Sequence, residues 1–281
     1  MAFLRQIELI VGAKGEDGFK ISNLRIAFEI EKTEKSENNT GKIRIYNLSK
    51  DTHNKISTAG LHCILKAGYQ DESIRSILFG DIVRGERKKS GTEYITELEV
   101  KDGREAVMNG YVSVSYEKNT EARLIAQDML DVMALPYKGI ENIPASAVYP
   151  GAFSDIGLAS DILKKVLNRF DLYYCIQNEM VYIMTENKEV ESTGLLLSPE
   201  TGLLTIPCAV SDKTSDDDNK AAAGNEWTFR TLLFPQLNPG VACVVNSPEI
   251  GLNATMKIKS TKFVGDNYGQ DFYIDIKAEV L

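Results

Sequence analysis

Hydrophobic and polar residues alternate over several stretches of the chain. In residues 24–30 (LRIAFEI) every second side chain is apolar, and Arg25 and Glu29 lie between apolar neighbours. A period of two is typical of a strand that buries one face. The same alternation recurs in residues 7–11, 43–45 and 94–100. Because the strands of a parallel sheet are apolar on both faces, these stretches predict antiparallel strands with one solvated face.

A polar segment, EKTEKSENNTG (residues 31–41), separates two of these strands. Its Ser, Asn, Thr and Gly residues favour a loop or a long hairpin tip, because they compete for backbone hydrogen bonds or tolerate positive φ. Farther along, Ser49 is suited to cap a short helix that Gly60 would close. Strands on both sides of this helix, through Val100, predict a closed or nearly closed barrel with the helix plugging one edge.

From residue 104 the pattern changes to helical spacing. In residues 119–135 one helical face carries Ile125, Met129, Val132 and Met133. In residues 154–170 one stripe carries Ala159, Ile162, Leu163, Val166 and Phe170. Glu121 lies where a helix N-terminus favours negative charge, and residues 177–179 (Gln-Asn-Glu) suit the turn of a following hairpin. Residues 105–191 therefore predict a small α+β domain.

Alternating strands return after residue 192 and continue to the C-terminus. The last of them, from Phe272 to Val280, has a length of about ten residues or 30 Å. The first and last thirds of the chain thus share an architecture. We predict a mainly β protein in which two antiparallel β-barrel domains, residues 1–104 and 192–281, flank the α+β domain.

Composition narrows the function classes. With 281 residues and 43% hydrophobic content, the chain is long enough for one large domain or two to three smaller ones. Its net charge of −8 argues against a surface that grips nucleic-acid phosphates. No window approaches 18 apolar residues, and Arg5, Gln6 and Glu8 interrupt the N-terminus where a signal peptide needs an apolar run. We expect neither a membrane span nor export by a signal peptide.

Residues that could carry chemistry are sparse. The cysteines, which we interpret as buried free thiols because no C-x-x-C pair occurs, are Cys63, Cys175, Cys208 and Cys243. The two histidines, His53 and His62, lack an H-E-x-x-H motif or a triad spacing, so we interpret both as structural. Trp227, the single tryptophan, is expected to anchor a core.

The acidic run SDKTSDDDNK (residues 211–220) invites comparison with a calcium loop. The alternating aspartates are Asp212, Asp216 and Asp218. Asp217 occupies the position that needs Gly, and Ala223 the position of the bidentate Glu, so we interpret residues 211–225 as a solvated, mobile loop. Nucleotide-binding glycine motifs are absent from the sequence. We assign no catalytic, cofactor-binding or metal-binding residue and expect no cofactor.

The order of these patterns is distinctive. Residues 24–52 (LRIAFEIEKTEKSENNTGKIRIYNLSKDT) join an alternating strand, a polar loop and an Ile-x-Ile-Tyr-Asn-Leu-Ser strand that runs into a helix. Further motifs are Ala67-Gly68-Tyr69, Phe79-Gly80-Asp81, Asp102-Gly103 and the segments ETGLL, LLFPQLNPGVACVV and GDNYGQDFYIDIKAEVL. In this order they resemble the baseplate central hub proteins of contractile-tailed bacteriophages, which are related to the hub part of type VI secretion spike proteins.

The resemblance implies a structural, non-enzymatic virion component of the tail baseplate, assembled in the host bacterial cytoplasm. It implies two tail-tube-like barrels per chain and a homotrimeric ring of six barrels that joins the six-fold tail tube to the three-fold spike. The implied partners are the tail tube protein, the tail spike and other baseplate proteins, with the tape measure protein as a further candidate. DNA would only pass through the channel, whose acidic wall would keep it from sticking, unless the acidity serves solubility alone.

Two alternatives remain open. One is the equivalent hub of a tailocin or another contractile injection system, which shares its parts with a phage. The other, and the lesser, is a wall-degrading tail enzyme that uses a pair of carboxylates. The Asp-rich insertion before Trp227 departs from the hub pattern. Because no spike or lysozyme segment follows in the sequence, we expect those functions on separate chains.

Overall fold

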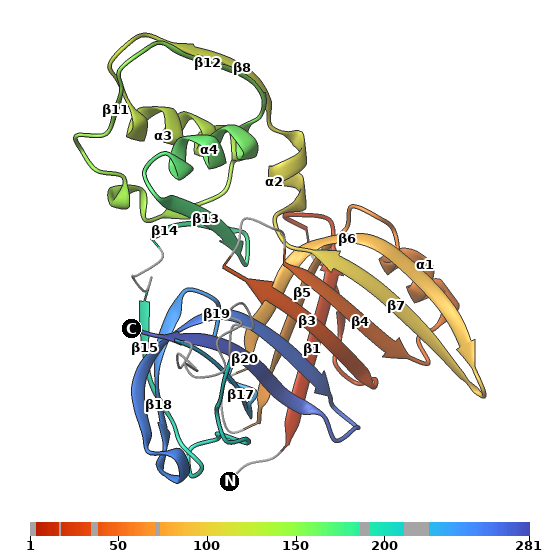
Figure 1. Cartoon of the computed structure of the whole chain (residues 1–281). Helices are drawn as coiled ribbons and strands as arrows, with labels where there is room; N and C mark the ends of the chain where they lie inside the picture. The colour runs from red at the N-terminus through yellow and green to blue at the C-terminus, as the bar shows by residue number, and fades with distance from the viewer. Residues whose placement is uncertain (1–3, 17, 35–38, 71–73, 186–190, 211–224) are drawn as a thin grey trace, which may run out of the picture.

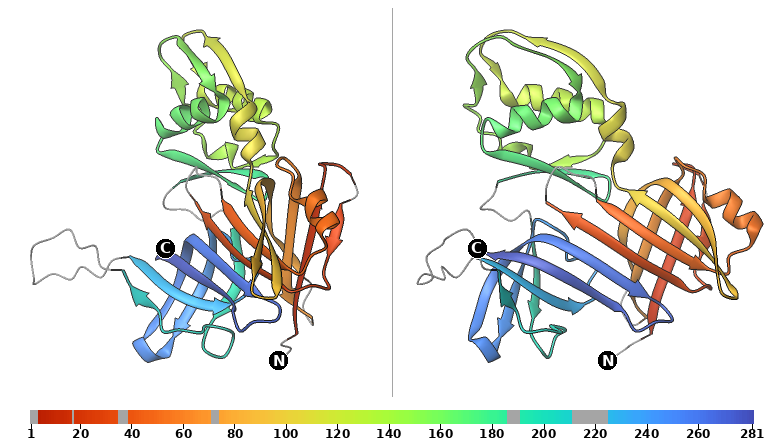
Figure 2. Two further views of the ribbon diagram at one scale, coloured as in Figure 1. Left: turned by 90° about the vertical axis from the view of Figure 1, so that its right-hand side faces the viewer. Right: turned by 45° about the vertical axis from the view of Figure 1, so that its right-hand side comes forward.

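The computed structural model describes residues 4–16, 18–34, 39–70, 74–185, 191–210 and 225–281 (Figure 1). Strands dominate both ends of the chain, and most of the helical residues lie in its middle. The prediction of a mainly β protein is confirmed. A compact body of helices and short strands stands above the two strand-rich ends in every view (Figures 1 and 2).

The first third of the chain consists of strands and a short helix. The strands are β1 (Arg5–Gly12), β2 (Phe19–Ile21), β3 (Ile26–Thr33), β4 (Thr40–Tyr46), β5 (His62–Tyr69), β6 (Arg75–Ser90) and β7 (Glu93–Lys101). The predicted alternation is present: Ile26, Phe28 and Ile30 are buried, whereas Glu29 and Glu31 lie on the opposite face of β3. All pairings within this third are antiparallel.

The short helix α1 (Lys50–Ile56) begins as the sequence predicts. The Ser49 hydroxyl accepts a hydrogen bond from the backbone N–H of Thr52 at 3.0 Å, which satisfies one of the unpaired donors of the first turn. The helix ends at Ile56 and not at Gly60. Ser57 is the C-cap, and Gly60, with φ +89°, belongs to the turn that leads into β5.

The middle of the chain packs helices against short sheets. The helices are α2 (Arg104–Asn109), α3 (Ala122–Met133), the 3-10 turn η1 (Ile140–Asn142) and α4 (Ala159–Asn168). The strands are β8 (Tyr111–Tyr116), β9 (Thr120–Glu121), β10 (Tyr137–Lys138), β11 (Val148–Tyr149), β12 (Phe153–Leu158), β13 (Leu172–Gln177) and β14 (Met180–Thr185). Buried residues of both long helices and of β13 and β14 share one apolar cluster.

Both predicted amphipathic helices exist, with corrections to their faces. Val132 is 42% exposed, because the buried stripe of α3 runs instead through Ala126 and Leu130. Residues 154–158 belong to β12, which pairs with β8, so α4 begins only at Ala159. Residues 154–158 alternate with a period of two, which suits pairing with β8, and they therefore form a strand instead of the first turn of the helix.

The last third returns to strands. They are β15 (Glu191–Leu197), β16 (Cys208–Ala209), β17 (Glu226–Leu232), β18 (Val241–Ser247), β19 (Leu252–Asp266) and β20 (Phe272–Val280), with the 3-10 turn η2 (Pro248–Ile250) before β19. β20 alternates throughout, as the sequence predicts. The pairing of β15 with β18 is parallel, whereas the other pairings within this third are antiparallel.

One long strand joins the two ends of the chain into a single sheet. The first part of β19 pairs with β18, its second part pairs with β3 of the first third, and β20 follows it along most of its length. The resulting 13-stranded sheet runs in the order β16-β17-β20-β19-β3-β4-β7-β6-β5-β1-β2, with β18 and β15 beside β19. Buried apolar residues of both ends form one cluster.

Two closed barrels are therefore not confirmed. Among the described residues the sheet ends at β2 on one side and at β16 on the other, and no ladder joins these ends. The edge of β3 that could have closed a first barrel is paired with β19 instead. The domain limits at residues 104 and 191 stay predictions.

The hairpin of β13 and β14 is held to the sheet by a buried carboxylate. Its turn residues Asn178 and Glu179 have φ of +54° and +58°, the left-handed pair that a two-residue hairpin turn requires. Asp102, fully buried after β7, accepts hydrogen bonds from both of their backbone N–H groups, at 2.7 and 2.9 Å. Burial raises the pKa of Asp102, which these hydrogen bonds and Lys32 oppose.

Two buried lysines complete the junction, and each joins all three parts of the chain. Lys32 of β3 donates to the side-chain oxygens of Asn178 and Asn238, both at 2.9 Å, and burial lowers the pKa of its ammonium to about 8. Lys257 of β19 donates to Tyr173 of β13 at 3.0 Å and pairs with Glu34, just beyond β3, at 3.3 Å. Figure 2 shows β13 and β14 seated over both strand-rich ends.

We predict that Asp102→Ala lowers the free energy of unfolding by about 3–5 kcal/mol, because it leaves a buried ammonium and two backbone donors without this partner. Urea denaturation measures the loss. The matched control is Asp275→Ala, which removes a 40% exposed carboxylate paired with Arg230 and should cost about 1 kcal/mol or less. Equal losses in the two variants would contradict the role given to Asp102.

A second carboxylate links the first and last thirds of the chain near the start of β3. Asp266 accepts hydrogen bonds from the Arg25 guanidinium at 2.8 Å and from the backbone N–H groups of Tyr268 and Gly269, both at 2.9 Å. Burial would raise the pKa of Asp266, but these donors outweigh it and hold the pKa below the ordinary value of 3.8.

We predict that Asp266→Asn destabilises the protein at neutral pH by about 1–2 kcal/mol. Because the pKa is lower in the folded state, the stabilisation is fully present above the ordinary value of 3.8 and is lost as the pH falls through the folded pKa. Thermal unfolding of parent and variant between neutral and strongly acidic pH should therefore converge at the acid end. A constant difference at all pH values would refute this assignment.

Candidate functional site

One face of the sheet carries rows of charged side chains. Strands β17, β20, β19, β3, β4 and β7 are neighbours in the sheet, and each turns alternate residues into the apolar core. The opposite positions hold the charged residues. They are Glu29, Glu31, Lys42, Arg44, Glu97, Glu99, Lys101, Arg230, Lys262, Asp275 and Lys277.

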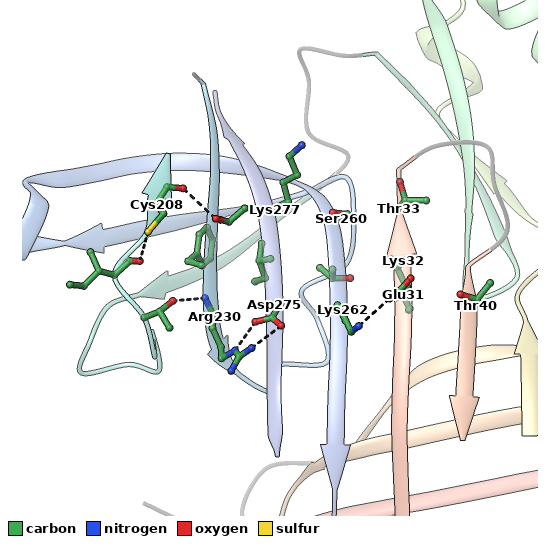
Figure 3. Close-up of a pocket in the computed structure, with 16 residues that line it drawn as sticks. Glu31, Lys32, Thr33, Thr40, Cys208, Arg230, Ser260, Lys262, Asp275 and Lys277 are labelled. Atoms are coloured by element: carbon green, nitrogen blue, oxygen red, sulfur yellow. Dashed lines mark hydrogen bonds and ion pairs between the residues drawn. The ribbon is translucent and has the colours of Figure 1, made fainter. Parts of the chain in front are cut away.

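The charges alternate in sign along two rows of cross-strand partners, whereas Glu226 faces Glu279 and Glu86 faces Glu97. One row of cross-strand partners runs from Arg230 through Asp275 and Lys262 to Glu31. Along it the Arg230–Asp275 pair measures 2.6 Å and the Lys262–Glu31 pair 3.2 Å (Figure 3). In a neighbouring row of cross-strand partners, Lys42 lies between Glu29 and Glu99. On the next strand, β6, the partner of Glu99 is Arg84. Opposite charges in facing positions stabilise a sheet, and like charges weaken it.

Ion pairing also shifts the acidities on this face. The ammonium of Lys262 lies 2.6 Å from Glu29 and lowers the pKa of that carboxyl, while Glu29 and Glu31 together raise the pKa of Lys262. Hydrogen bonding to Asp275 raises the pKa of Arg230 in the same way. The face is therefore charged throughout the physiological pH range, with its charges largely paired.

A cavity of about 850 Å³ opens on this face beside β16. Hydroxyl groups of Thr33, Thr228 and Ser260 and the charged ends of Lys277 and Arg230 line it (Figure 3). A glycosidase requires a protonated carboxyl and a second carboxylate across a cleft.

The two carboxylates in this lining, Glu31 and Asp275, are each paired with a cation, as described above. Apolar atoms, among them those of Ile206, also form part of the lining, so the cavity is of mixed polarity.

The two histidines have different surroundings. The His53 imidazole lies 3.2 Å from the Thr96 hydroxyl, and burial lowers its pKa. His62 faces two carboxylates, with its Nδ1 atom 3.7 Å from Asp81 and 3.6 Å from Glu179, and they raise its pKa. Sequence analysis missed this cluster, because Glu179 is far from the other two residues in the chain.

Three of the four cysteines are buried, as predicted, and burial raises the pKa of each to about 12; they are Cys63, Cys175 and Cys243. The prediction is wrong for Cys208, which is exposed because β16 is a two-residue strand at the end of the sheet. Trp227 is half-buried and packs against the core cluster. The aspartates of the acidic run, Asp212, Asp216 and Asp218, lie outside the described residues.

Comparisons with known proteins identify the fold. No family model matches the chain, and no curated protein matches its sequence. The 43 kDa tail protein of prophage MuSo2 from Shewanella oneidensis is similar in structure, with a TM-score of 0.66, 10% identity and 98% of each chain covered. A tail protein from Neisseria meningitidis gives a TM-score of 0.62 and 13% identity, over 97% of this chain and 96% of the other.

A third similar structure is an E. coli component of the type VI secretion system, itself described as similar to the T4 bacteriophage tail proteins gp27 and gp5. It gives a TM-score of 0.60 and 11% identity, over 96% of this chain and 76% of that one. The chain therefore has the fold of phage tail proteins and of related secretion components, and the resemblance noted in the sequence is confirmed as a likeness of fold. None of the described helices has both the length and the apolar composition that a membrane-spanning helix needs.

We predict that Lys262→Glu lowers the free energy of unfolding by about 1–2 kcal/mol, because it places a fourth negative charge among Glu29, Glu31 and Asp275. Lys262→Gln, which removes the charge without reversing it, is the control and should cost less. Since Lys262 is 40% exposed, high salt should shrink the difference between the two variants. Urea denaturation at low and high salt checks this; a difference unchanged by salt would point to packing instead.

Proposed function

We propose that this protein is a structural component of a contractile tail, the baseplate hub that joins the tail tube to the spike. The observation that supports it most is the fold, shared along 96–98% of the chain with phage tail proteins and a type VI secretion component. The continuous sheet adds to this, because one chain carries two strand-rich ends side by side. No catalytic residue is needed for such a role.

In this proposal three chains form a ring. Residues 1–104 and 192–281 each supply one tube-like unit, completed into a barrel-like shape in the assembly, so a trimer presents six units to the six-fold tube and three-fold symmetry to the spike. Residues 105–191 stand outside the ring as the middle domain. Closed symmetric rings satisfy sheet edges that a single chain leaves unpaired, and β2 and β16 are the ends of the described sheet.

The charged sheet face is proposed to line the DNA channel. An acidic wall was expected from the net charge of −8, yet two rows of this face alternate positive and negative side chains. Paired charges produce a weak field beyond a few ångströms in salt solution, so they neither hold nor strongly repel a passing phosphate backbone. DNA would pass along the wall because the positive and negative charges of the wall cancel. The net negative charge of the whole chain then serves solubility.

The proposed partners are the tail tube protein, the spike and other baseplate proteins, with the tape measure protein as a further candidate. A hub of a headless contractile injection system is an alternative supported by the likeness to the type VI component. A wall-degrading enzyme has less support, because both carboxylates of the large cavity are paired with cations.

We expect the purified protein to form a trimer, alone or with its spike, because the ring needs three copies to match both symmetries. Light scattering with and without the candidate spike protein measures the mass, which should be three times that of the 281-residue chain. A strict monomer in both conditions would leave the fold intact and overturn the hub proposal. Clearing of cell walls in a zymogram, lost on a single Glu→Gln change, would support the enzyme instead.

A further inference from the structure

Three side chains able to bind a metal meet beside the junction of the hairpin and the sheet. His62 begins β5, Asp81 is its cross-strand partner on β6, and Glu179 lies in the turn between β13 and β14. One ligand atom from each lies within 4.8 Å of the others. None of these residues has a role in the proposed channel.

The imidazole of His62 points a nitrogen between the two carboxylates without a hydrogen bond. Its Nδ1 atom is inaccessible to solvent and has no hydrogen-bond partner. The separations of 3.7 Å to Asp81 and 3.6 Å to Glu179 exceed the range of an N–H···O bond. The Nδ1 atom and the two carboxylates thus face one another without a direct hydrogen bond, and a cation between them would contact all three groups.

We propose that His62, Asp81 and Glu179 bind a divalent transition-metal ion of the zinc type. Ligand bonds of about 2.0–2.2 Å at tetrahedral angles place ligand atoms roughly 3.4 Å apart. The two distances from His62 Nδ1 would contract by about 0.3 Å or less, and the carboxylate oxygens, which lie within 4.8 Å of each other, would move closer together around the ion. One imidazole nitrogen with two carboxylates favours zinc or a similar ion, whereas calcium and magnesium prefer oxygen ligands alone. Nδ1 ligation places the imidazole proton on Nε2.

The surroundings supply a fourth position and support for a ligand. Asp81 and Glu179 both line a cavity of about 330 Å³ between the sheet and α2 and α3, large enough to admit water to the ion. The backbone N–H of Glu105 lies on the Asp81 side of this cavity and favours the ionised carboxylate, the form that binds a metal ion. Gly80 lets β6 approach β7 closely at this point, because a Cβ there would clash with the backbone of Lys101.

One cation already competes for the cluster. The ammonium of Lys14 lies 3.3 Å from the Glu179 carboxylate, but its side chain is 59% exposed and can turn into solvent. A bound ion would replace this exposed pair by a bond that fastens Glu179 to β5 and β6. The two aspartates of the Phe79-Gly80-Asp81 and Asp102-Gly103 motifs would then hold the same turn, one through the metal and one through backbone N–H groups.

The experiment is a calorimetric titration of Zn²⁺ into the full chain after chelator treatment. A second titration uses Co²⁺, whose binding is followed by visible absorption. Cys208→Ser serves as the background, because this exposed thiol could bind either ion. We expect one ion per chain, with affinity reduced on the order of tenfold or more by His62→Gln or Glu179→Gln. Lys14→Met, which removes the competitor and no ligand, should tighten binding.

The matched control is Asp216→Asn, in the acidic run outside the described residues, which should leave affinity unchanged. Far-UV circular dichroism checks that each variant is folded. Absence of stoichiometric binding would overturn the proposal. So would binding that Asp216→Asn abolishes, or an affinity that neither His62→Gln nor Glu179→Gln changes. Absence of binding would leave a protonated imidazole between the carboxylates as the occupant. The mass measured by light scattering does not depend on this ion.

Discussion

Two buried ammonium groups and one buried carboxylate govern how the three parts of the chain fit together. Taking a lysine or an aspartate out of water is costly unless partners surround it, and here the partners come from all three parts. Lys32 and Lys257 each contact the first third, the hairpin and the last third. The position of the hairpin is thus coupled to the alignment of the first and last thirds of the chain, because moving one part would leave a buried charge without its partners.

The continuous sheet and its charged face follow from the same arrangement. Once β3 pairs with β19, side chains from distant strands become direct neighbours, and one row of alternating charges continues from β17, β20 and β19 onto β3. A mutually paired face is stable without a ligand and presents little net field. Such a face suits a passage or a contact surface better than acid–base chemistry, in which a carboxyl must stay protonated.

Local patterns predicted much of the fold. The alternation in residues 24–30, the Ser49 cap and the left-handed turn at Asn178 and Glu179 depend on neighbouring residues, so the chain itself reports them. Lys32 was missed, because the sequence analysis assigned residues 31–41 to a polar loop, whereas β3 continues to Thr33 and buries Lys32. The site was harder to predict, because cross-strand partners and the cluster of His62 with Glu179 join residues more than a hundred positions apart.

Side-chain spacing along the chain predicts its elements: antiparallel strands with one buried face, two amphipathic helices, a hairpin and their order. Spacing is a local property, so these elements can be read from neighbouring residues. Three features depend on long-range packing: both ends share one sheet, Cys208 is exposed, and buried charges hold the hairpin to the sheet. Each of these depends on which distant strands meet, and a free strand edge accepts any partner whose register buries its apolar face.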